Sequence, residues 1–265
     1  MPDDFFSGVL QTEFDLGEYK IPAPTFYRDC RFFMGLYPAR LAEAKRILPD
    51  KRFSPAQIIP GVAAASLTAL EYRDTDIGPY NEFGVGIALN SPQFAAIPGY
   101  NFLRQTPQMY SYSYLKELPV TTNIALIGGL AVGFPKFMAS IEFSDTDDWL
   151  TCEVKEGEDH ICTLRGRKIP APHSDQMKMF PHFYQNMQPQ WTEFKVNARE
   201  YGVSFKQADL ELSLGSHRVS DKIRRLFLST KPLMYSYVPS IQGILYAAEH
   251  ITMNGVKQLI DIAQT

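Results

Sequence analysis

Polar and apolar residues alternate along much of the 265-residue chain, and short apolar runs bounded by turn residues occupy much of the rest. The clearest alternation sets Tyr110, Tyr112 and Tyr114 against Ser111 and Ser113. A period of two is typical of a strand with one buried face. On these two patterns we expect strands at 27–36, 57–72, 83–89, 110–114, 121–132, 138–143, 149–154, 160–165, 191–196, 210–214 and 235–245. We expect the strands at 149–154 and 160–165 to form a hairpin around the turn at 155–159.

Helical periodicity is confined to three short segments. In the first, Leu41, Ala44, Ile47 and Leu48 share one face, and Pro38 suits the first helical position. The others are 221–228, with Ser220 as the expected N-cap, and 251–262. The proline-containing stretches 90–108 and 169–191 are expected to run over the surface or act as lids.

The chain has no internal repeat, low-complexity linker or break in composition. We therefore expect an N-terminal arm over 1–26 and a single domain over 27–265. Many strands and few helices predict the α+β class with predominantly antiparallel β structure.

Charge and composition narrow the classes of partner. The 26 basic and 29 acidic residues give a net charge of −3, which argues against recognition of nucleic acid or an anionic membrane by bulk charge. No run approaches the ~20 apolar residues of a membrane span, and no secretory signal pattern opens the chain. The three cysteines, Cys30, Cys152 and Cys162, show no tight spacing and fit buried thiols in a reducing compartment. The alternative is a Cys152–Cys162 disulfide across a hairpin. We expect a cytoplasmic protein that acts on a small molecule.

One lysine stands in an unusually apolar segment. From Ile124 to Ala139, Lys136 is the only ionisable residue, and Pro135 and Phe137 flank it. Burial favours the neutral form of an amine, and a neutral amine is a nucleophile that can attack a carbonyl group. The alternative is a lysine at a strand end, with its stem packed and its ammonium group in water.

Among the acidic residues, Glu82 is the candidate partner, because it opens the apolar strand 83–89 and could move protons near Lys136. The alternative is an ordinary solvated turn residue. The five histidines lack the spacing of metal ligands, and no glycine-rich phosphate loop is present. We therefore expect neither a metal nor an organic cofactor.

Several segments, taken in order, resemble the acetoacetate decarboxylase family. Gly128…Gly133-Phe134-Pro135-Lys136 is similar to the family segment that carries the Schiff-base lysine, and Gly78-Pro79-Tyr80-Asn81-Glu82 to the turn that carries an active-site glutamate. Similar segments also occur at 32–49, 197–199 and 236–245, so the resemblance covers about 27–251. It implies a closed or double β-barrel with an internal cavity, a homo-oligomer, and catalytic roles for Lys136 and Glu82.

The chain departs from the family pattern at charged positions. Phe137 stands where the family has a second lysine that helps to lower the pKa of the first. The carboxylate-binding arginine of the family falls near Cys30, which makes the flanking Arg28 and Arg31 candidates for that role. These departures favour a larger and more apolar substrate than a small keto acid.

Two functions follow as hypotheses. The first is a cofactor-independent Schiff-base lyase that decarboxylates a keto acid, or catalyses aldol or dehydration chemistry on a ketone or aldehyde. The second is a non-covalent binder or cyclase of an apolar, polyketide-like molecule in the same cavity. The candidate substrate-binding residues are Arg28, Arg31, Tyr80, Phe83, Tyr112, Phe134 and Phe137.

Overall fold

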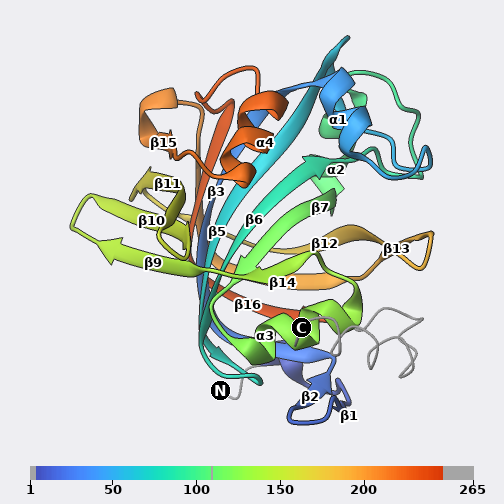
Figure 1. Ribbon diagram of the computed structural model, residues 1–265, viewed down its shortest axis with the longest axis vertical. Coiled ribbons are helices and arrows are strands. Elements are labelled where there is room, and N and C mark those ends of the chain that lie inside the picture. Colours follow the sequence, from blue (N-terminus) through green and yellow to red (C-terminus); the bar gives the residue numbers. More distant parts are fainter. Residues whose placement is uncertain (1–3, 109, 247–265) are drawn as a thin grey trace.

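The computed structural model describes residues 4–108 and 110–246, without the side chains of 105–110, and strands dominate it (Figure 1). The helix expected at 251–262 lies outside the described residues. The strands are β1 Thr12–Asp15, β2 Lys20–Ala23, β3 Thr25–Arg40, β4 Gln57–Ile59, β5 Val62–Thr75, β6 Tyr80–Ala88, β7 Tyr110–Val120, β8 Lys136–Met138, β9 Ser140–Asp145, β10 Trp149–Glu156, β11 Asp159–Arg167, β12 His173–Gln185, β13 Gln188–Trp191, β14 Phe194–Ser204, β15 Leu210–Leu214 and β16 Met234–Leu245. The α-helices are α1 Leu41–Ile47, α2 Tyr100–Gln108, α3 Asn123–Val132 and α4 Arg218–Leu226.

The larger sheet closes into a barrel. Its strands follow the order β12-β14-β16-β3-β5-β6-β7, and a parallel pairing between β7 and β12 joins the two ends. The other contacts around this ring are antiparallel. The predicted α+β class, with mainly antiparallel strands and a closed barrel, is therefore confirmed.

A second, four-stranded sheet, in the order β15-β11-β10-β9, packs on the outside of the barrel (Figure 1). It contains the predicted 149–165 hairpin as β10 and β11. One core joins Leu150 and Leu164 of this sheet to Phe33, Leu67 and Phe83 of the barrel. Because side chains alternate along a strand, the neighbours of these barrel residues point into the barrel instead. The outer face of β3, β5 and β6 makes the core, and the inner face is left for a cavity.

The prediction of a strand at 121–132 was wrong, because α3 occupies residues 123–132. Its sequence is apolar on every side, so it carries no helical periodicity, and two internal glycines lower its helix propensity. The helix connects β7 to β8, which pair in parallel. Parallel neighbours need such a crossover. The N-terminal half of β7 pairs with β12 and its C-terminal end with β8, so β8 takes the place of β12 at one end of the barrel.

Other local predictions also need correction. Residues 169–191 are not a surface excursion, since β12 is a barrel strand and β13 pairs with its C-terminal end. Pro38 remains in β3, and α1 begins only at Leu41. The N-cap of α4 is His217, whose side chain accepts a hydrogen bond from the Val219 amide, rather than Ser220.

Residues 12–23 form the antiparallel hairpin β1–β2, which packs on α3 through Leu16, Ile21 and Ala131. In the part of the chain that the structure describes, no helix has the length and apolar character needed to cross a bilayer. The expected homo-oligomer and cytoplasmic location stay predictions.

The packing of Phe83 gives a stability test. Its side chain is fully buried between the barrel and the second sheet. Phe83→Ala should lower the free energy of unfolding by about 3–5 kcal/mol, measured by urea denaturation. Phe205, which is 77% exposed, is the matched control, and its replacement by alanine should cost less than ~0.5 kcal/mol. Equal effects of the two substitutions would contradict the packing described above.

Candidate functional site

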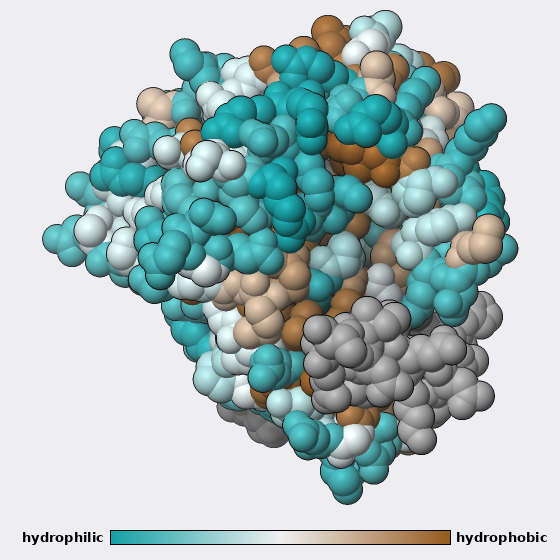
Figure 2. Space-filling model, viewed as in Figure 1, coloured by the Kyte–Doolittle hydropathy of each residue, from teal (hydrophilic) through white to brown (hydrophobic). Residues whose placement is uncertain are grey.

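The inner face of the barrel surrounds a cavity of about 140 Å³. A cavity of about 150 Å³ in another protein holds a benzene molecule, so this one suits a small organic ligand. Figure 2 shows apolar residues gathered in a hollow at the centre of a mostly hydrophilic face. The cavity is lined by Tyr27, Phe32, Met34, Ser66, Thr68, Leu70, Tyr72, Tyr80, Glu82, Gly84, Gly86, Ser111, Ser113, Leu115, Leu118, Phe134, Lys136, Met179, Pro181, Phe194, Ile241 and Leu245.

Lys136 and Glu82 form a buried ion pair in the cavity wall. Nζ of Lys136 lies 2.8 Å from Oε2 of Glu82, and the side chains are only 6% and 9% exposed. Glu82 is on β6 and Lys136 on β8, with β7 between them. The hydroxyl of Tyr72 donates a 3.2 Å hydrogen bond to the other carboxylate oxygen, Oε1. The carboxylate is thereby held with one oxygen toward the amine.

Aromatic rings enclose the amine. Nζ of Lys136 lies 5.5 Å from the ring centre of Tyr80 and 6.0 Å from that of Phe134. The hydroxyls of Tyr80 and Tyr27 are 3.3 Å apart. Burial raises the pKa of Tyr72 and of Tyr80 well above its usual value, and the nearby Glu82 charge raises both further. Both phenols therefore stay protonated, and neither acts as a base.

Two glycines fix the path of the lysine side chain. A Cβ at Gly129 would lie 2.2 Å from Cδ and 2.4 Å from Cε of Lys136, so only glycine lets the lysine cross α3 at this point. Gly133 ends α3 in the left-handed conformation, with φ of 106°, and turns the chain toward β8. The glycine-rich sequence before Lys136 thus has a steric explanation.

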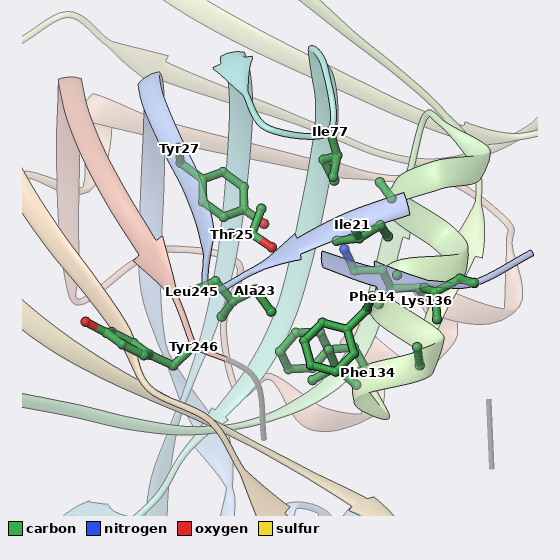
Figure 3. A pocket seen from close by; sticks show the side chains of 16 residues that line it. Phe14, Ile21, Ala23, Thr25, Tyr27, Ile77, Phe134, Lys136, Leu245 and Tyr246 are labelled. Carbon is green, nitrogen blue, oxygen red and sulfur yellow. The ribbon is translucent and has the colours of Figure 1, made fainter. Parts of the chain in front are cut away.

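Lys136 also lines a second cavity, of about 60 Å³ (Figure 3). The hairpin β1–β2 and α3 form its walls, with Phe14 and Ile21 from the hairpin. Both cavities are lined by Tyr27, Phe134, Lys136 and Leu245. The Lys136 side chain therefore contributes to the walls of both cavities.

The structure brings together four of the residues singled out from the sequence: Lys136, Glu82, Tyr80 and Phe134. Phe83 and Phe137 do not line the cavity. Phe83 follows Glu82 in β6, and Phe137 follows Lys136 in β8, so both point to the opposite face of their strands. Phe83 is in the core, and the ring of Phe137 contacts the Arg218 guanidinium at 5.1 Å. Tyr112 also faces outward, stacked on Phe180 with 4.8 Å between ring centres.

Both candidate arginines lie outside the cavity lining. Arg28 pairs with Asp76 at 2.5 Å. Arg31 pairs with Glu71 and Asp145, each at 2.5 Å. Neither supplies a cation for a substrate carboxylate inside the barrel.

Sequence reasoning missed the polar residues of the inner face. Tyr72, the donor to Glu82, is among them, and so are the hydroxyls of Ser66, Thr68, Ser111 and Ser113. The alternation of side chains along β5 could have revealed these residues. One face of β5 carries Ser66, Thr68, Leu70 and Tyr72, and this face continues into the face of β6 that carries Glu82.

Comparison with protein families gives a match to acetoacetate decarboxylase (ADC) over residues 15–243. The chain belongs to the acetoacetate decarboxylase family. Comparison with curated protein sequences gives no significant match.

Several solved structures share the fold. An acetoacetate decarboxylase from Legionella pneumophila matches with a TM-score of 0.61 and 14% identity, over 93% of this chain and 95% of that one. The enduracididine biosynthesis enzyme MppR, complexed with pyruvate, matches with a TM-score of 0.59 and 12% identity, over 86% and 90%. An acetoacetate decarboxylase-like enzyme from Sphingomonas wittichii RW1 matches with a TM-score of 0.55 and 12% identity, over 84% and 90%.

The ion pair predicts a stability difference. Glu82→Gln leaves the Lys136 ammonium buried without a counter-charge and should lower the free energy of unfolding by about 3–5 kcal/mol near neutral pH. Urea denaturation measures this loss, and the double variant Lys136→Met/Glu82→Gln should recover part of it. The exposed pair Glu153–Lys155 is the control, and Glu153→Gln should cost less than ~1 kcal/mol. Strict additivity of the Lys136 and Glu82 substitutions would show that the two groups are not coupled.

Proposed function

We propose that this protein is a cofactor-independent Schiff-base lyase that acts on a small carbonyl compound through Lys136. The observation that carries the proposal is the 2.8 Å contact between Lys136 Nζ and Glu82 in the wall of the cavity. An amine that attacks a carbonyl needs a neighbouring proton acceptor and shelter from water. Family membership supports the proposal, and so does MppR, a relative of the same fold whose structure contains pyruvate.

Iminium formation uses the ion pair directly. The Glu82 carboxylate accepts a proton from the Lys136 ammonium, and the neutral amine attacks the carbonyl carbon. A proton moves from the attacking nitrogen to the carbonyl oxygen, which gives a carbinolamine. Glu82 then returns its proton to that hydroxyl group, which leaves as water. The resulting iminium carries the same positive charge as the original ammonium, so it remains paired with the Glu82 carboxylate.

The iminium then accepts the electron pair of a bond next to it. The leaving group is carbon dioxide from a β-keto acid, an aldehyde from a β-hydroxy ketone whose hydroxyl proton passes to Glu82, or a proton that passes from the adjacent carbon to Glu82. In each case an enamine forms. Protonation of its carbon, or loss of a β-hydroxyl group as water, regenerates an iminium that water hydrolyses to free Lys136. The Tyr72 hydrogen bond holds Oε1 of Glu82, which leaves Oε2 to exchange protons.

Chemical trapping tests the proposal. Incubation with ketones and keto acids in the presence of cyanoborohydride should convert the iminium to a stable secondary amine, located on Lys136 by peptide mass mapping. Glu82→Gln should slow adduct formation about 100-fold or more, because proton transfer is lost. If no carbonyl compound labels Lys136, while Lys136→Met keeps full activity on a substrate of the protein, the cavity is a non-covalent site and the proposal is wrong.

The helix glycine offers a second test. Gly129→Ala places a methyl group against Cδ and Cε of Lys136 and should displace the amine from Glu82. We expect trapping at Lys136 to fall at least about 10-fold, since a misplacement of about 1 Å can reduce a rate about 100-fold. Gly128→Ala is the matched control, because its methyl group meets the end of the Ile21 side chain instead. A Gly129→Ala variant that is trapped at the rate of the unaltered protein would contradict the steric role.

A further inference from the structure

The cavity continues past the ion pair along the inner faces of β5 and β6. Leu70 pairs with Glu82, Thr68 with Gly84, and Ser66 with Gly86. Residues on one face of a strand repeat about every 7 Å. The Thr68–Gly84 pair of β5 and β6 therefore lies about 7 Å from Glu82 along the strands, and the Ser66–Gly86 pair lies about 13 Å from it.

This distant end of the cavity carries aliphatic hydroxyl groups among apolar side chains such as Leu115 and Leu118, whereas aromatic rings surround Lys136. Four hydroxyl side chains line it: Ser66 and Thr68 from β5, and Ser111 and Ser113 from β7. Among the residues that the structure describes, no side-chain hydrogen bond engages these four hydroxyls. Hydroxyl groups that face a confined space need a partner, and a bound molecule can provide it. We call this set of four residues the hydroxyl trough.

Glycines keep the hydroxyl trough open. A Cβ at Gly86 would lie 2.9 Å from Oγ of Ser66 and 3.8 Å from Cβ of Ser113, so it would occupy the space between β5 and β7. A Cβ at Gly84 would contact Leu118 and Thr68 at ordinary distances. The part of the cavity next to Gly84 and Gly86 of β6 is therefore available to a ligand that extends from Lys136.

The charges of the cavity lining are already balanced. Its lining includes one cation, Lys136, and one anion, Glu82, and the buried Tyr72 and Tyr80 stay protonated. An iminium keeps this balance, because it replaces the ammonium charge. A substrate carboxylate would add a second negative charge with no second cation among the lining residues, since Arg28 and Arg31 are paired elsewhere. A buried unpaired charge is strongly disfavoured.

We propose, on the basis of the Schiff-base function above, that the substrate is an uncharged ketone or aldehyde with a hydroxyl group remote from its carbonyl. The carbonyl carbon bonds to Lys136, and the remote hydroxyl group exchanges hydrogen bonds with the hydroxyl trough. A substrate without a carboxylate has no carbon dioxide to release. The reaction at this site is then aldol-type cleavage, aldol addition or dehydration.

Three methyl ketones with the same five-carbon skeleton test the proposal, because they differ only in the group at the far end. These are acetopropyl alcohol, methyl propyl ketone and levulinate, which carry a hydroxyl, a methyl and a carboxylate group. The concentration that gives half-maximal cyanoborohydride trapping at Lys136 is measured for each. We expect the alcohol to be trapped at the lowest concentration and levulinate at a concentration at least about 10-fold higher.

Variants of the trough separate recognition from chemistry. Thr68→Val and Ser66→Ala should reduce the preference for the alcohol over the plain ketone about 3-fold to 10-fold, the effect of one hydrogen bond. Gly86→Ala, which narrows the trough, should reduce the same preference. Ser213→Ala, on the exposed face of β15, is the control and should leave the preference unchanged.

The outcomes distinguish this inference from the proposed function. If levulinate is trapped at Lys136 as readily as the alcohol, or if the trough variants leave the preference intact, the inference is overturned while the Schiff-base function stands. If none of the three ketones, nor any other carbonyl compound tried, is trapped at Lys136, the Schiff-base function fails and the inference fails with it.

Discussion

The buried contact between Lys136 and Glu82 is the constraint on which the rest of the site depends. A lone charge of either sign would be strongly disfavoured at 6–9% exposure, so each group makes the burial of the other tolerable. The pair also bears on the proposed chemistry. With Phe137 in place of a second lysine, no adjacent ammonium is available to favour the neutral amine. Under the proposed mechanism, Glu82 at 2.8 Å instead accepts the proton of Lys136 directly.

The fold supports this contact in three ways. The crossover β7–α3–β8 brings Lys136 into the barrel beside β7, at the end where β12 no longer pairs with that strand. Gly129 gives the lysine side chain the space to cross α3. The hairpin β1–β2 packs on the same helix, so residues 12–23 contribute to the wall behind the amine (Figure 3). The hydroxyl trough extends the site in the opposite direction, along β5, β6 and β7.

Much of the fold could be predicted from the sequence, because strands with one buried face leave a clear period of two. The same signal fails for α3, whose residues are buried on several sides and show no periodicity. The site was predictable in part. Lys136 stood out by its apolar neighbours, and Glu82 by its place at the start of a strand. Phe83 and Phe137 could have been excluded by alternation alone, since neighbouring residues on a strand face opposite sides. The positions of Arg28 and Arg31 were not predictable, because their partners Asp76, Glu71 and Asp145 are distant in sequence.

Exchange of the carbonyl oxygen of acetopropyl alcohol with water labelled with heavy oxygen tests the central claim most directly. Each cycle of iminium formation and hydrolysis replaces that oxygen, and mass spectrometry follows the replacement without a trapping reagent. We predict that the protein accelerates the exchange, that Glu82→Gln slows it, and that Lys136→Met abolishes the acceleration. Exchange at an unchanged rate in the Lys136→Met variant would contradict the assignment of Lys136 as the nucleophile.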